Sequence, residues 1–350
     1  MTGVCCYTNF TYAYAGRALT LLETVRSAHP DWAVCAMVVD EPPPGLDPGL
    51  LAGFDRVMRL TELGIPRLRA WLFKHDVIEA CTAVKGAAML RLMEAGFDTV
   101  VYLDPDIAVF APLTPVLDAL EHASIVLTPH QVSPNANLAV ARDNELMALR
   151  FGVYNLGFIA VRNDPVGQGF AKWWSVQLLR ACYDDAAAGL FTDQKYVDLV
   201  PALFDRVAIV RDAGCNVASW NLSARPVVIG RDGRITAGGA LLRFYHFTKI
   251  GSVGDVMTDR YSGDRLDVAE IWAWYGRRIA CHQPDGAAAW AYGAWNDGPP
   301  VPYAVRVLYR DSREHLAAYD DPFDAAGPFR TWLMQNQPAL LATPSTSAAA

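Results

Sequence analysis

Two aspartates separated by one proline, Asp104 and Asp106, are the residues whose types and spacing most directly suggest chemistry. They follow the apolar run 100–103, and Pro105 between them ends ladder pairing and turns the chain. Two carboxylates this close repel each other unless a positive charge lies between them. Mn²⁺ or Mg²⁺, which prefers oxygen ligands and is often shared with substrate phosphates, would supply that charge. The pattern predicts a metal site, and the alternative is a turn with two solvated aspartates.

Two further groups could complete such a site. His246 ends a short apolar run late in the chain, and neutral imidazole suits the same ions. A lone histidine in this position is more often a core or edge residue, but with Asp104 and Asp106 it forms a candidate ligand set. Lys249 carries a charge that could neutralise a phosphate group, and its alternative is an ordinary surface lysine.

Other polar residues lie at the expected ends of elements. Asp193 and Gln194 follow Thr192, which we expect to cap the N-terminus of a helix. Asn155 lies at the start of an expected strand, 154–161. Each has a structural alternative, which is a capping acid for Asp193 and a turn residue for Asn155.

A polar and aromatic group at 214–221 interrupts an otherwise apolar region. The Trp220 ring could form an apolar platform for a sugar, with Asn216 and Asn221 hydrogen-bonded to its hydroxyl groups. Packing of Trp220 in the core is the equal alternative.

Four segments, in chain order, resemble the motifs of nucleotide-sugar-dependent glycosyltransferases with the GT-A fold. The resemblance is strongest to family 8, the retaining, metal-dependent group of bacterial galactosyl- and glucosyltransferases, glycogenins and galactinol synthases. The segments are Tyr102-Leu-Asp104-Pro-Asp106 for the family's Y-L-D-x-D motif, Tyr154-Asn155-Leu-Gly-Phe158 for F-N-[SA]-G, Thr192-Asp193-Gln194 for D-Q, and Phe244-Tyr-His246-Phe247 for H-F. The resemblance extends over residues 1–250.

The resemblance implies roles for most of these residues. The metal ligands would be Asp104, Asp106 and His246, and the catalytic residues beside the donor sugar would be Asp193, Gln194 and Asn155. The nucleotide would lie at the end of the first strand, and a basic residue before a later helix would contact the sugar or phosphate. The candidates for donor binding are Thr8, Asn9, Tyr12, Lys85, Asp104 and Lys249. The Gly and Lys that usually follow the H-F motif are spaced differently here, so Lys249 departs from the family's pattern.

The implied reaction moves a sugar from a nucleoside-diphosphate sugar, such as a UDP- or GDP-sugar, to a hydroxyl group on a carbohydrate, lipid-linked glycan or protein. The family's members suggest a bacterial enzyme of polysaccharide biosynthesis. The sequence shows no dedicated general base, and with the Asp193–Gln194 element this favours retention; inversion with Asp193 as the base is the alternative. A sugar-1-phosphate nucleotidyltransferase should carry a Gly-rich loop where this chain has residues 9–13. A non-catalytic carbohydrate-binding protein could use the aromatic residues from Trp272 onward, but it would not need the metal set.

Alternating apolar runs and helical periodicities must position these residues. We expect strands at 4–8, 33–39, 56–60, 99–103, 124–127, 154–161, 207–210, 227–229 and 241–245. We expect helices at 17–28, 66–94 with a break near Thr82, 114–121, 170–183, 265–279 and 311–319. Such alternation predicts an α/β fold with a mostly parallel sheet and flanking helices, and the resemblance makes it a Rossmann-like GT-A sheet.

The residue composition of the chain changes near residue 251, and this change predicts the domain organisation. We expect a catalytic, nucleotide-sugar-binding domain at 1–250, an aromatic-rich acceptor-side extension with a closing flap at 251–342, and a disordered tail at 343–350.

Composition narrows the classes of partner. The 350 residues carry 30 basic and 37 acidic side chains, a net charge of −7, which argues against nucleic-acid binding. No apolar stretch reaches the roughly 18 residues that a membrane-spanning helix needs, and the first residues do not resemble a secretion signal. The seven cysteines fit reduced thiols. We therefore expect a cytoplasmic protein, with a peripheral contact at the inner membrane face left open.

Overall fold

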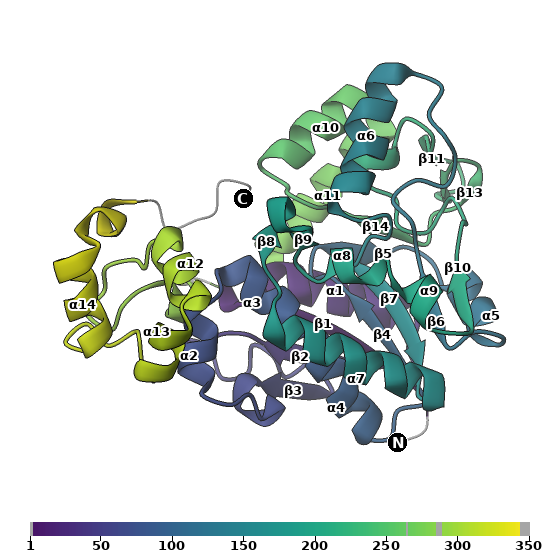
Figure 1. Cartoon of the computed structure of the whole chain (residues 1–350). Coiled ribbons are helices and arrows are strands. Elements are labelled where there is room, and N and C mark those ends of the chain that lie inside the picture. The colour runs from purple at the N-terminus through teal and green to yellow at the C-terminus, as the bar shows by residue number, and fades with distance from the viewer. Residues whose placement is uncertain (1–2, 264, 285–288, 344–350) are drawn as a thin grey trace.

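The computed structural model describes residues 3–263, 265–284 and 289–343, and its centre is a seven-stranded sheet with the order β10-β6-β7-β4-β1-β2-β3 (Figure 1). Its strands are β1 (Val4–Phe10), β2 (Ala33–Val38), β3 (Arg56–Arg59), β4 (Thr99–Leu103), β6 (Ile125–Leu127), β7 (Phe158–Arg162) and β10 (Val207–Ile209). Neighbouring strands are parallel except for β7, which runs antiparallel to both β4 and β6. The expected mostly parallel α/β sheet is confirmed.

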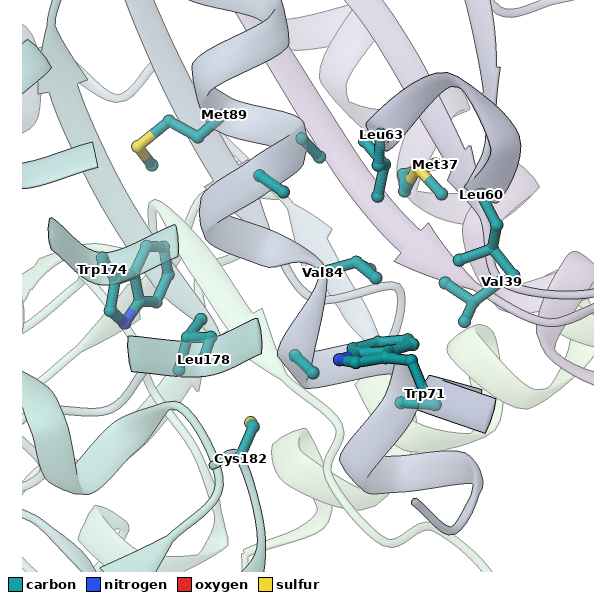
Figure 2. Close-up of a cluster of buried hydrophobic side chains, with 14 of the residues drawn as sticks. Met37, Val39, Leu60, Leu63, Trp71, Val84, Met89, Trp174, Leu178 and Cys182 are labelled. Carbon is teal, nitrogen blue, oxygen red and sulfur yellow. The ribbon is translucent and has the colours of Figure 1, made fainter. Parts of the chain in front are cut away.

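Helices cover both faces of this sheet, so its strands alternate between two hydrophobic cores. On β1, Cys5 and Tyr7 face the first core, whereas Cys6 faces the second. The first core is covered by α2 (Leu68–Phe73), α3 (Val77–Ala83), α4 (Lys85–Glu94) and α7 (Pro165–Arg180), and the second by α1 (Ala15–Ala28) and α5 (Thr114–Leu120). Figure 2 shows Trp174 of α7 and Met89 of α4 in the first core. Burial on both faces explains why the strands read as continuous apolar runs.

Smaller sheets lie beyond the central one. The pairs are β5 (Ile107–Val109) with β14 (Phe244–His246) and β8 (Asp184–Asp185) with β9 (Leu190–Phe191), and the three-stranded sheet contains β11 (Val227–Ile229), β12 (Ile235–Ala237) and β13 (Ala240–Leu241). A third core forms where Tyr245 and Phe247 meet Tyr275 of α11 (Leu266–His282). The strand expected at 241–245 is therefore divided between β13 and β14.

The C-terminal part of the chain divides into two groups of helices. α10 (Val253–Ser262) and α11 lie on one side of the molecule, whereas α12 (Tyr303–Asp311), α13 (Arg313–Ala318) and α14 (Pro328–Asn336) lie beside α2 (Figure 1). Trp290 and Trp295 are buried in the first core, as is Phe329 of α14, whose ring packs edge-on against Phe73. The tail expected at 343–350 falls outside the described residues except for Thr343.

Three expectations about local structure were wrong. The segment 66–94 breaks at residues 74–76 as well as near Thr82, because Asp76 caps α3 by accepting a hydrogen bond from the backbone of Glu79. The segment 154–161 begins as a turn, and β7 starts only at Phe158. Thr192 does not cap a helix: its backbone is left-handed (φ 43°), and α8 begins after Asp193, which makes no side-chain capping bond.

Some elements were not expected at all. α6 (Leu138–Phe151) is a 14-residue helix in which Asn137 caps the N-terminus by accepting from the Ala139 backbone. The remaining short helices are α8 (Gln194–Val197), α9 (Val200–Leu203), η1 (Tyr12–Tyr14), η2 (Leu60–Leu63), η3 (Ala186–Ala188), η4 (Ser219–Asn221), η5 (Ala291–Gly293) and η6 (Pro338–Ala342). Of the helices in the described ranges, none combines the length and apolarity needed to span a membrane.

Candidate active site

Asp104, Asp106 and His246 meet at the carboxyl end of β4. Asp104 follows β4 directly, and β5 begins just after Asp106. Because β5 pairs antiparallel with β14, His246 lies opposite Ile107 and reaches the two aspartates. One ligand atom from each of the three residues lies within 4.8 Å of the others. Nε2 of His246 is 3.0 Å from Asp106 Oδ1 and 3.8 Å from Asp104 Oδ2.

Asn155 fixes how the imidazole of His246 is presented. Its Oδ1 accepts from the Gly157 backbone at 3.2 Å and from Asn216 Nδ2 at 3.2 Å, which identifies it as the amide oxygen, and it lies 3.1 Å from His246 Nδ1. An oxygen can only accept, so Nδ1 carries a proton and donates it, and Nε2 faces the aspartates. A Cβ on Gly157 would collide with the His246 ring, so only glycine allows this close approach.

The electrostatics of this set suit a cation. Burial lowers the pKa of His246, but the charges of Asp106 and Asp104 outweigh it and raise the pKa overall. Burial raises the pKa of Asp106, but His246 outweighs it and the pKa is lowered. The two aspartates therefore favour a positive charge on the imidazole, and the same donor set fits Mn²⁺ or Mg²⁺ with a neutral imidazole.

Lys85 is a buried cation between two carboxylates. It is the first residue of α4, and its Nζ lies 3.1 Å from Asp104 Oδ1 and 2.8 Å from Asp193 Oδ2. It also donates to the Leu156 carbonyl at 2.9 Å and lies 4.3 Å from the centre of the Tyr102 ring. Burial lowers the pKa of Lys85, but the two carboxylates outweigh this effect and raise it. Lys85 therefore stays protonated and joins Asp104 to Asp193.

Asp193 pairs with Lys85, and Gln194 lies beside Asn155 and the turn before β7. The Thr192 hydroxyl donates to Asp193 Oδ1 at 3.1 Å. Burial raises the pKa of Asp193; Lys85 opposes this and Asp104 adds to it, and the pKa is raised overall. Gln194 donates through Nε2 to the Phe151 carbonyl at 3.0 Å, and its Oε1 accepts from the Leu156 backbone at 3.3 Å. The Gln194 side chain thus holds the end of α6 against the turn before β7.

A cavity of about 430 Å³ opens against these groups, within the roughly 300–1,000 Å³ of small-molecule sites. It brings together nine of the predicted site residues, namely Lys85, Asp104, Asp106, Asn155, Asp193, Gln194, Trp220, His246 and Lys249. Lys249, whose backbone is left-handed (φ 52°), also lines the cavity. The predicted metal and catalytic residues, which are scattered along the sequence, therefore form one site at the carboxyl edge of the sheet.

The other predicted residues do not line this cavity. Thr8, Asn9 and Tyr12 are buried at the end of β1, where Asn9 donates to the Cys81 carbonyl at 3.1 Å. Among the described residues, the Thr8 hydroxyl and the Asn9 amide oxygen have no hydrogen-bond partner.

Asn216 and Asn221 are also buried behind the cavity wall. Asn216 donates to Asn155 Oδ1, and Asn221 braces its own turn by accepting from the Ala218 backbone at 3.0 Å. Their positions support the wall that carries Trp220 and do not place their amides in the cavity.

Sequence reasoning missed one wall of the cavity. Met147 and Phe151 of α6 line it, as do Val253 and Met257 of α10. The signal for α6 was present, because Asn137 is a strong cap and residues 138–151 contain neither Gly nor Pro.

His130 was missed too. Burial lowers its pKa to about 4, so it is neutral, and its ring packs edge-on against Trp220 at 5.3 Å.

Comparison with known proteins gives distant relatives. No protein-family model matches the sequence. YfnF of Bacillus subtilis, described as uncharacterized, is 27% identical over 188 residues, which cover 52% of this chain and 61% of YfnF. YfnD of the same organism, also described as uncharacterized, is 26% identical over 195 residues, which cover 55% of this chain and 60% of YfnD. The chain thus spans about three fifths of the length of these relatives.

Solved structures of glycosyltransferases match the chain at low identity and with TM-scores below 0.5. The galactosyltransferase LgtC, in complex with donor and acceptor sugar analogues, matches with a TM-score of 0.47 and 16% identity over 79% of this chain and 95% of its own. Mouse xyloside xylosyltransferase 1 matches with a TM-score of 0.42 and 12% identity over 71% of this chain and 98% of its own.

Proposed function

We propose that this chain is a metal-dependent glycosyltransferase that moves a sugar from a UDP- or GDP-sugar to a hydroxyl group of a carbohydrate, lipid-linked glycan or protein. The observation that carries the proposal is that Asp104, Asp106 and His246 share one cavity with Lys85 and Asp193. A divalent ion and a nearby lysine can neutralise the charge of a diphosphate-activated sugar.

Asp104, Asp106 and His246 would hold Mn²⁺ or Mg²⁺. When bound, the ion supplies positive charge that stabilises the departing diphosphate. Asn155 keeps the His246 ring turned so that Nε2 faces the aspartates. Lys85 holds one carboxylate oxygen of Asp104 in place.

The donor would extend from this set in two directions. Asp193 and Gln194 would face the sugar, and Lys249 would contact the phosphates. Thr8, Asn9 and Tyr12 would hold the nucleotide at the end of β1. The unpartnered Thr8 hydroxyl and Asn9 amide oxygen, noted above for the described residues, support a polar ligand there.

Retention of anomeric configuration is the outcome that the charges favour. Asp104 and Asp193 are both paired with Lys85, and Asp106 is paired with His246. These ion pairs turn the carboxylates toward their cations and away from an acceptor hydroxyl, so the departing phosphate oxygen would take that proton. Inversion would require Asp193 to act as the base despite its pairing.

The domain organisation is part of the proposal. Residues 1–250 would form the donor-binding catalytic domain. Residues 251–342 would form the acceptor side, which the position of Val253 and Met257 on the cavity wall supports.

The proposal is tested by measuring Mn²⁺-dependent binding of a panel of UDP- and GDP-sugars by calorimetry, together with slow release of UDP or GDP in water. The wild-type chain should bind one donor, and EDTA or Asp106→Ala should abolish binding because the ligand set is incomplete. Asp118→Ala, which alters an exposed aspartate on α5, is the matched control and should bind normally. Donor binding that survives both EDTA and Asp106→Ala would refute the metal site. Proton NMR of the first-formed sugar reports its anomer, and inversion would refute the retaining course.

A further inference from the structure

A second wall of the cavity is built by α6, α10 and η4. Figure 1 shows α6 and α10 side by side, and Asp143 of α6 accepts from Arg260 Nη1 of α10 at 2.7 Å and from the Tyr261 hydroxyl. These bonds tie the two helices together, and Asp143 itself lines the cavity beside Asn144.

Asn144 is the feature of this wall that its fold does not explain. It is the one buried residue of α6 and is only 4% exposed, and it lines the cavity. Both its amide nitrogen and its amide oxygen lack a hydrogen-bond partner within the described parts of the chain. Buried polar groups are nearly always hydrogen-bonded in native proteins, so a fully unpartnered carboxamide inside a cavity points to a ligand.

The same wall carries a second buried polar group, the indole N–H of Trp220. Trp220 of η4 lines the cavity, and its buried Nε1 donor also has no partner among residues that the structure describes. By contrast, the carboxamide of Asn155, which lines the cavity beside the metal set, bonds to His246 and Gly157. The wall formed by α6, α10 and η4 therefore offers hydrogen-bonding capacity that the protein leaves unused.

Apolar side chains line the cavity on the same wall, together with polar ones such as Asp143 and His130. Met147 and Phe151 of α6 and Met257 of α10 line the cavity. A sugar ring has apolar C–H faces and a rim of hydroxyl groups that both donate and accept. An amide that can donate and accept, an indole N–H and thioether or aromatic surfaces together match such a ring.

We infer that Asn144 is a sugar-binding residue, whose carboxamide hydrogen-bonds to hydroxyl groups of a ring seated against the α6–α10 wall, with Trp220 Nε1 as a further donor. This inference rests on the proposed function. The ring belongs either to the acceptor or to the donor, and the chemistry is the same in both cases.

The test replaces Asn144 with leucine, which is close in size and removes both hydrogen-bonding atoms. Methyl glucoside and methyl galactoside serve as acceptor probes, followed by saturation-transfer NMR, and Mn²⁺-dependent calorimetry with the donor found above forms the second arm. The loss of two hydrogen bonds should weaken one of the two arms by about tenfold to thirtyfold. The arm that changes identifies the ring.

Two controls separate binding from structure. Leu149→Ala alters a side chain of α6 that is 66% exposed, and it should change neither arm. Because Asn144 has no partner to lose in the described structure, Asn144→Leu should unfold at the same temperature as the wild type or higher. A lower unfolding temperature, or unchanged affinity in both arms, would overturn the inference. Absence of any Mn²⁺-dependent donor binding by the wild type would instead refute the proposed function, and the glycoside arm would still test Asn144.

Discussion

The two walls of the cavity differ in whether their buried polar groups have partners within the protein. Around the metal set, each of these charged groups is held by partners: Lys85 by Asp104 and Asp193, and His246 by Asp106 and Asn155. On the wall formed by α6 and α10, Asn144 is buried without a partner among the described residues. Exposed apolar side chains also gather on α6, with Leu138, Leu146 and Leu149 each more than half exposed.

This difference indicates that the two walls contribute differently to catalysis and to ligand binding. Groups that hold one another keep their geometry without a ligand, which is how a site is preorganised to stabilise charge. A wall with unused hydrogen-bonding groups gains partners only when a ligand binds. Its role is therefore to select the ligand and not to catalyse the reaction. Changes near the metal set should therefore cost stability and chemistry together, whereas changes on α6 and α10 should affect ligand binding alone.

Lys85→Met should have the largest effect. Without the ammonium group, Asp104 and Asp193 repel each other in a buried site, and breaking a buried ion pair from one side costs about 3–5 kcal/mol. We expect that loss in the free energy of unfolding, measured by urea denaturation in the presence of EDTA, together with loss of donor binding.

Lys195→Met is the matched control for this change. Lys195 pairs with Asp198 at 2.9 Å in a partly exposed position, so its loss should cost no more than about 1 kcal/mol. Equal costs for the two lysines would show that Lys85 does not hold the metal wall together.

Gly157→Ala should have an intermediate effect. The added methyl group would displace the His246 ring from its place beside Asn155, and loss of ligand orientation typically lowers metal affinity by about 10- to 100-fold. Calorimetric titration with Mn²⁺ measures this change.

The control for Gly157 is Gly169, an exposed glycine of α7 with open space around its Cβ position. Gly169→Ala should leave Mn²⁺ affinity unchanged and stabilise the helix by about 0.5–1 kcal/mol. If Gly157→Ala bound Mn²⁺ as tightly as Gly169→Ala, His246 would not be a ligand held by this contact.

Arg260→Gln should have the smallest effect. It removes one of the two bonds that tie α10 to Asp143, and the Tyr261 hydroxyl keeps the other. We expect affinity for the sugar that contacts Asn144 to fall by about threefold, while Mn²⁺ affinity stays constant. Arg91→Gln, which breaks an exposed pair with Glu94 elsewhere on the surface, should change neither quantity. A fall in Mn²⁺ affinity with Arg260→Gln would mean that the two walls are not independent.

Much of the metal wall could be predicted because its signals are local. An apolar strand that ends in Tyr102-Leu-Asp104-Pro-Asp106 specifies both the strand and the turn that exposes the carboxylates. Lys85 could be named as a site residue, but its role between Asp104 and Asp193 depends on packing of α4 that no local pattern encodes.

The wall formed by α6 and α10 could not be predicted in the same way. Residues 128–138 read as a polar turn, and α6 that follows has few buried residues, so its apolar pattern is weak. That Asn144 is buried follows only from where α10 and η4 lie against α6.

The sequence by itself determined the alternating α/β pattern and the carboxylates at the end of β4, since strand propensity, helical periodicity and the turn at Pro105 act over a few residues. Only the tertiary structure decided which distant groups join them. The antiparallel direction of β7 brings Asn155 to the same edge as Asp104, and the pairing of β5 with β14 brings His246 beside Asp106. Strand direction and partner choice depend on burial of both sheet faces across the whole chain, and no short segment carries that information.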